Sequence, residues 1–133
     1  MKVGLDTSVV LRLLIGEPEA QAKQAVSFLN RSLERGDQPV VSDLVVSEVY
    51  FALQHHYRVP KAEVLHVLRD FFGSGDVENV GVAAKVLETN GLDHAKPGFL
   101  DRVIYTQYLQ HAHAMVTFEK AAQKLGNVHL IQP

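Results

Sequence analysis

The chain has 133 residues, of which 47% are hydrophobic and 21% are charged, and these values predict one folded globular domain over residues 1–133. Its formal net charge of −2 excludes the strongly basic surface by which many nucleic-acid-binding proteins attract phosphate. The absence of cysteine excludes disulfide scaffolds, thiolate zinc sites and cysteine nucleophiles.

The apolar segments predict a cytoplasmic protein that does not associate with a membrane. No apolar run reaches the roughly 20 residues that a membrane-spanning helix needs. The first six residues, Met-Lys-Val-Gly-Leu-Asp, are too short and too quickly charged to act as a signal peptide.

Short apolar strands alternate with amphipathic helices along the whole chain. We expect Asp43 to cap one of these helices and Pro60 to open the next. In chain order, the pattern predicts a strand at 3–5, helices around 9–14 and 22–33, a strand at 39–42, helices around 46–53 and 65–72, a strand at 77–80, helices around 82–87 and 99–110, a strand at 114–117, a short helix at 118–125 and a strand at 128–131. This alternation predicts an α/β fold with a mostly parallel sheet and helices on both faces.

Four carboxylates stand where a parallel sheet presents its ligands, beyond the carboxyl ends of strands or in the first turns of nearby helices. They are Asp6, Glu48, Asp101 and Glu119. Each also has a purely structural interpretation. Asp6 can be a helix N-cap, and Asp101 and Glu119 can complement a helix dipole.

Glu48 is the least easily explained as a structural residue. Its neighbours three and four positions away on the helix, Leu44, Val45, Phe51 and Ala52, are all apolar. A carboxylate on such a stripe is expected to be partly buried and therefore to need a cation or a metal as its partner.

Carboxylates that converge at one sheet edge suit Mg²⁺ or Mn²⁺, which prefer oxygen ligands. Such an ion can activate water and stabilise the charge that develops during phosphodiester hydrolysis, so that no protein nucleophile is required. The pattern therefore favours metal-dependent hydrolysis.

Four short segments in this order resemble the PIN-domain ribonucleases, and among them the VapC-type toxins of toxin–antitoxin pairs. The resemblance covers nearly the whole chain and rests on Val3-Gly4-Leu5-Asp6-Thr7-Ser8-Val9-Val10, Ser47-Glu48-Val49, Phe99-Leu100-Asp101 and Val116-Thr117-Phe118-Glu119-Lys120.

The resemblance implies a five-stranded parallel sheet, Mg²⁺- or Mn²⁺-dependent endoribonuclease activity, a homodimer, and inhibition by a small antitoxin. It assigns Asp6, Glu48 and Asp101 to the metal-binding acids, with Glu119 as the fourth catalytic carboxylate. Thr7, Ser8 and Thr117 correspond to supporting polar positions.

Glu119 departs from the family pattern, which commonly has Asp at that position. The extra methylene moves the carboxylate outward, so both direct and water-mediated metal binding stay open, as do one-metal and two-metal sites. A non-catalytic module that binds RNA or dimerises is the alternative function.

Basic side chains near the same edge are candidates for contacts with the phosphates of RNA, with an ordinary charged surface as the alternative. These candidates are Arg12, Arg102 and Lys120. The seven histidines do not favour zinc, because neither His55 and His56 nor His111 and His113 have the spacing that places two rings on one helix face.

Overall fold

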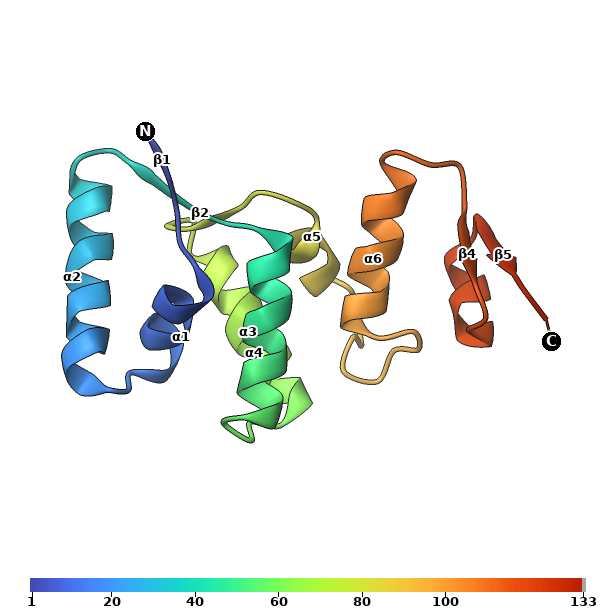
Figure 1. Ribbon diagram of the computed structural model, residues 1–133, viewed down its shortest axis with the longest axis horizontal. Coiled ribbons are helices and arrows are strands. Elements are labelled where there is room, and N and C mark those ends of the chain that lie inside the picture. Colours follow the sequence, from blue (N-terminus) through green and yellow to red (C-terminus); the bar gives the residue numbers. More distant parts are fainter. Residues whose placement is uncertain (133) are drawn as a thin grey trace.

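The computed structural model describes residues 1–132, so the last residue of the predicted domain lies outside the described part. Six α-helices, one 3-10 helix and five short strands occur within this range. In chain order (Figure 1) they are β1 (Lys2–Gly4), α1 (Thr7–Ile15), α2 (Glu19–Glu34), β2 (Gln38–Val41), α3 (Asp43–His55), α4 (Lys61–Gly73), β3 (Glu78–Asn79), α5 (Ala83–Leu87), α6 (Phe99–Leu109), β4 (Met115–Thr117), the 3-10 helix η1 (Lys120–Leu125) and β5 (Val128–Leu130).

The predicted elements are all present, with boundaries shifted by a few residues. Local chemistry explains several of these boundaries. Asp6 caps α1 by accepting a hydrogen bond from the Val9 N–H, and Gly16 ends that helix with a φ of 78°, a left-handed conformation that favours glycine. Pro60 directly precedes α4, as expected.

The strands form two separate parallel sheets, so the prediction of one five-stranded sheet is wrong. One sheet has the order β1-β2-β3, and the other contains β4 and β5. Lys2 pairs with Gln38 in the first sheet, and Met115 pairs with Val128 in the second. Sequence periodicity identifies strands but not their partners, and here α6 stands between the two sheets (Figure 1).

The buried core lies around α3 and α4. Val46, Val49 and Leu53 of α3 pack with Val64 and Leu68 of α4, and all five side chains are almost completely buried. An edge-to-face contact between Tyr50 and Phe99, with ring centroids 5.0 Å apart, extends this core from α3 to α6.

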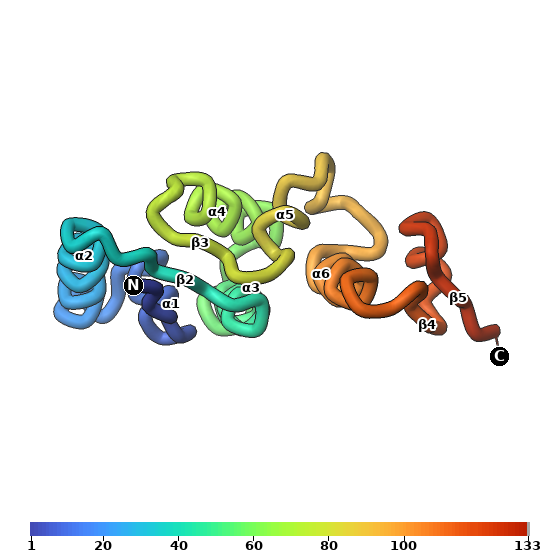
Figure 2. The backbone as a smooth tube through the Cα atoms, turned by 90° about the horizontal axis from the view of Figure 1, so that it is seen from above, coloured from blue at the N-terminus to red at the C-terminus, as the bar shows by residue number. Residues whose placement is uncertain are grey.

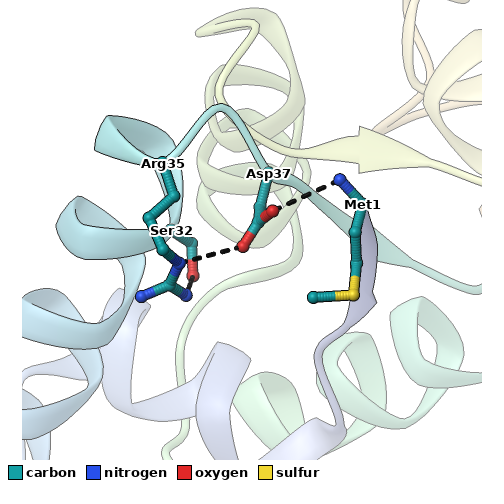
Figure 3. A network of polar contacts seen from close by, with 4 residues as sticks. All are labelled: Met1, Ser32, Arg35 and Asp37. Carbon is teal, nitrogen blue, oxygen red and sulfur yellow. Dashed lines mark hydrogen bonds and ion pairs between the residues drawn. The ribbon is translucent and has the colours of Figure 1, made fainter.

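A polar network ties the start of β1 to the turn between α2 and β2 (Figure 3). The Met1 ammonium donates to Asp37 Oδ1, and Arg35 Nε donates to Asp37 Oδ2, each over 3.2 Å. Arg35 also donates to Ser32, which is fully buried. The hydrogen bond from the Met1 ammonium is the main reason that the pKa of Asp37 is lowered. This network secures the register of β1 against β2.

Asp43 is a buried junction rather than the predicted helix cap. Ser42 is the N-cap of α3, and Asp43 is its first residue. The Asp43 carboxylate accepts hydrogen bonds from the backbone N–H groups of Val82 and Ala83 and from the side-chain amides of Asn79 and Gln107. It therefore joins α3 to the segment between β3 and α5 and to α6.

The environment of Asp43 favours its ionised form. Burial raises the pKa of this carboxyl, but its hydrogen bonds outweigh that effect and hold the pKa below its usual range. A Cβ at Gly81 would collide with the carboxylate of Asp43, so residue 81 has no room for a side chain.

The C-terminal part of the chain has almost no core of its own. Ala122 is the only buried residue between residues 110 and 132. Both views place β4 and β5 at the opposite end of the molecule from β1, beyond α6 (Figures 1 and 2). No helix within residues 1–132 has the length and apolar character to cross a membrane.

We predict that Asp43→Asn lowers the free energy of unfolding by about 2–4 kcal/mol at neutral pH, because the asparagine N–H₂ faces groups that are themselves donors. Urea denaturation measures this difference. Because the folded pKa of Asp43 is lowered, its carboxylate stabilises the fold above about pH 4 and less as the pH falls below that value. The difference from wild type should therefore shrink in acid.

Asp76→Asn is the matched control, since Asp76 is exposed in the turn before β3. This control should unfold like the wild type. Equal stability of Asp43→Asn and wild type at neutral pH would contradict the junction role.

Candidate active site

Asp6 lies two residues after the end of β1 and combines a capping role with an exposed carboxylate. Its Oδ1 accepts hydrogen bonds from Ser8 Oγ at 2.7 Å and from the Val9 N–H at 3.2 Å. These two bonds, in that order of importance, lower the pKa of Asp6. The carboxylate is therefore ionised at neutral pH and still accessible to a ligand.

Glu48 is positioned by Thr7, whose hydroxyl donates to Glu48 Oε1 over 2.6 Å. This hydrogen bond joins the first residue of α1 to the middle of α3. Because Thr7 follows Asp6 directly in the chain, it places Glu48 beside the start of α1. Asp6 and Glu48 are called the N-terminal acidic pair below.

The predicted burial of Glu48 is wrong. Glu48 is exposed, and its neighbours Leu44 and Phe51 on the same stripe are 73% and 60% exposed. The opposite stripe of α3, with Val46, Val49, Tyr50 and Leu53, faces the core instead. Glu48 therefore needs no cation to offset burial. Its hydrogen-bond partner in the structure is the Thr7 hydroxyl.

Asp101 and Glu119 form a second pair, called the C-terminal acidic pair. Asp101 lies in the first turn of α6, and Glu119 lies between β4 and η1. Both line a hollow of about 230 Å³ between α6 and β4. Thr117 lines the same hollow and accepts a hydrogen bond from the Glu119 N–H at 3.0 Å, which fixes the turn after β4.

The structure does not bring the two pairs together within one chain. Among residues 1–132, no group of three or more histidine, aspartate or glutamate side chains is placed so that it could hold a metal ion. The expectation that all four carboxylates meet at one sheet edge is therefore wrong for the single chain. The cause is the separation of β4 from β1, since each strand carries its own acid.

Each of the predicted phosphate-binding cations has a different environment. Arg12 Nε donates to Gln21 Oε1 at 2.7 Å, and Arg12 lines a hollow that also includes Ser8. Arg102 Nε donates to the Pro97 carbonyl at 2.7 Å, which holds it against its own helix start. Lys120 is exposed at the start of η1. Among the three, Arg12 lies nearest in the chain to the N-terminal acidic pair.

The N-terminal acidic pair fits a hard divalent cation in its donor chemistry. Two exposed carboxylates and the Thr7 and Ser8 hydroxyls supply oxygen ligands of the kind that Mg²⁺ and Mn²⁺ prefer. Within residues 1–132, none of the four acids of the two pairs forms an ion pair with a lysine, arginine or histidine. Their charge is thus available to a ligand.

The sequence pattern did not point to two features of the site region. The first is the Asp43 junction, whose distant partners become neighbours only in the folded chain. The second is a hollow of about 570 Å³ beside β1, lined by residues of β1, α1 and α2. Neither feature leaves a signal in the sequence, because each depends on how elements pack in the folded chain.

The family model described as PIN domain matches residues 3–128 of the chain. Comparisons with curated proteins and with solved structures find no match. The matched range includes both acidic pairs.

We predict that the cap and the charge of Asp6 can be separated by mutation. Asp6→Asn keeps a good N-cap and should leave the free energy of unfolding nearly unchanged, whereas Asp6→Ala should lower it by about 0.5–2 kcal/mol. Thermal or urea denaturation of both variants checks this. Equal losses in the two variants would contradict the capping geometry.

Proposed function

Since the chain belongs to the PIN-domain family, whose members are generally nucleases, we propose that it is a Mg²⁺- or Mn²⁺-dependent endoribonuclease that hydrolyses RNA phosphodiester bonds. The observation that supports this best is the N-terminal acidic pair, in which two exposed carboxylates are tied together through Thr7. We assign the proposed activity to the chain as one domain.

In this proposal, Asp6 and Glu48 hold the divalent ion from one side, and Asp101 and Glu119 complete the acidic site. When bound, the ion supplies activated water and neutralises charge on the phosphate. Ser8 and Thr7 keep the two carboxylates oriented through the hydrogen bonds described above. Arg12 and Lys120 contact phosphates that flank the cleaved bond.

We further propose that the protein is the toxin of a type II toxin–antitoxin pair, that it forms a homodimer and that a small antitoxin protein inhibits it. The resemblance of the segments around Asp6, Glu48, Asp101 and Glu119 to VapC-type toxins supports this role. These four carboxylates have no lysine, arginine or histidine partner among residues 1–132, which also suits an inhibitor that inserts a basic side chain.

A non-catalytic module that binds RNA is the second candidate function. The separation of the two acidic pairs within one chain favours it, because neither pair alone surrounds an ion with four carboxylates. Glu119 in place of the family's usual Asp points in the same direction.

We predict that the purified protein cleaves a mixed pool of structured RNAs with Mg²⁺ or Mn²⁺ but not with a chelator. Asp6→Asn should reduce the rate by at least about 100-fold, because it removes one of the charges that bind the ion and stabilise the transition state. Gel analysis of end-labelled RNA measures the cleavage. Asp76→Asn, a remote exposed carboxylate, should retain full activity.

Mn²⁺ binding is predicted to stabilise the folded protein. At an ion concentration roughly 100-fold above Kd, the gain is about 2.7 kcal/mol, and it appears as a rise in Tm. Asp6→Asn and Glu48→Gln should each reduce the rise, whereas Asp76→Asn should not. Binding of RNA without a metal-dependent rise and without cleavage would favour the non-catalytic module.

A further inference from the structure

Within residues 1–132, the outer edge of β1 has no partner strand. Leu5 N donates to the Val40 carbonyl, and Gln38 N donates to the Met1 carbonyl, so the backbone groups of residues 1, 3 and 5 face β2. Because these groups alternate along a strand in a parallel ladder, those of Lys2 and Gly4 face the open side. An edge of this kind is a template for pairing with another strand.

A hollow adjoins β1, with α1 and α2 forming its other walls. It has a volume of about 570 Å³, and Val9, Ala25 and Phe28 contribute apolar side chains from α1 and α2. Gly4 belongs to the same hollow, and a Cβ at this position would have no atom within 4 Å. Among residues 1–132, β1 pairs with β2 alone, so its other edge is open to a further strand.

The second sheet has the complementary feature. β4 pairs only with β5 among residues 1–132, and a two-stranded sheet is marginally stable by itself. Val116 of β4 is 60% exposed, and Phe118 directly after β4 is 70% exposed. These apolar side chains need cover that the single chain does not provide.

The β4 strand of the same chain is not the occupant of this edge in the structure. Gln107 donates to Asp43 Oδ2 at 2.7 Å, and Phe99 packs on Tyr50, so α6 is held against α3. β4 lies on the far side of α6 from β1 (Figures 1 and 2). A second copy can offer β4 to β1 without breaking these contacts.

The surface area agrees with a missing second copy. The structure exposes 8190 Å², whereas a compact monomer of 14.7 kDa exposes about 6,900 Å². The excess of about 1,300 Å² per chain is enough for a stable interface, which buries about 1,200–2,000 Å² in total.

We propose that β4 of a second copy pairs in parallel with the open edge of β1, and that the exchange is mutual, so that two such joints close a two-fold dimer. Parallel pairing continues the arrangement of both existing sheets. Each joint extends the sheet to the order β3-β2-β1-β4-β5, with the last two strands supplied by the second copy.

The dimer completes the acidic site, a consequence that rests on the proposed function. Asp6 lies two residues after the end of β1, and Glu119 lies two residues after the end of β4. Parallel neighbours end at the same edge of a sheet, so the C-terminal acidic pair of one copy meets the N-terminal acidic pair of the other. Each site then contains residues from both copies.

Cross-linking tests the joint without reference to activity. Because the chain has no cysteine, Gly4→Cys and Val116→Cys introduce single reactive thiols. A short bismaleimide should link the two variants into a heterodimer when they are mixed, after unfolding and refolding together. Gly4→Cys mixed with Glu63→Cys, whose residue is exposed on α4, should give no such product.

Two results would overturn the joint. One is a cross-link that forms only within a monomer of the double variant Gly4→Cys, Val116→Cys. Such a product would show that β4 pairs with β1 of its own chain. The other is a wild-type protein that sediments as a monomer at all concentrations. Val116→Lys should shift a wild-type dimer toward monomer and keep the helical circular dichroism signal.

Complementation tests whether the site is shared. The Asp6→Asn and Glu119→Gln variants are each expected to be inactive. A heterodimer of the two variants can be purified through two different tags. One of its two sites combines the intact Asp6 of one copy with the intact Glu119 of the other. The heterodimer should therefore recover about half of the wild-type activity. An inactive heterodimer beside an active wild type would refute shared sites. An inactive wild type that still cross-links as expected would instead refute the nuclease and leave the joint intact.

Discussion

The buried Asp43 carboxylate is the interaction on which the arrangement of this protein depends. It accepts hydrogen bonds from two segments that are distant from it in the sequence, residues 79–83 and α6, and a nearby glycine leaves it the necessary space. A buried carboxylate is costly unless donors surround it, so the segments that supply these donors are held in one relative position. The position of α6 follows from this, and the position of β4 follows from α6.

This placement of α6 explains the division of the acidic residues. The N-terminal acidic pair depends only on contacts between α1 and α3, which the core brings together. The C-terminal acidic pair depends on α6 and β4, which the Asp43 junction keeps on the other side of the molecule. Two half-sites of similar chemistry therefore occur in one chain.

The open edge of β1 and the poorly buried C-terminal sheet both result from the separation of β4 and β5 from the first sheet. A strand edge exposes backbone groups that pair readily, and an exposed apolar strand lacks cover. The two strands also matter for the proposed function, because β1 is followed two residues later by Asp6 and β4 is followed two residues later by Glu119. In the mutual dimer, one docking event would satisfy the backbone, cover the apolar side chains and unite the carboxylates.

Much of the local structure could be predicted from the sequence. Helices and strands follow from apolar periodicity, and the Asp6 cap follows from Asp-Thr-Ser before a helical pattern, since these depend on residues close together in the chain. The order of the acidic motifs also points to the PIN family without the structure.

The buried face of α3, the pairing of the strands and the surroundings of Asp43 depend on the packing of the folded chain. The stripe around Glu48 is as apolar as the stripe that faces the core, so periodicity could not show that Glu48 is exposed. The separation of the two sheets and the Asp43 junction depend on contacts between residues far apart in the chain. A pattern of side chains along a sequence determines local conformation, whereas partners are chosen by packing and by the hydrogen bonds that buried polar groups require.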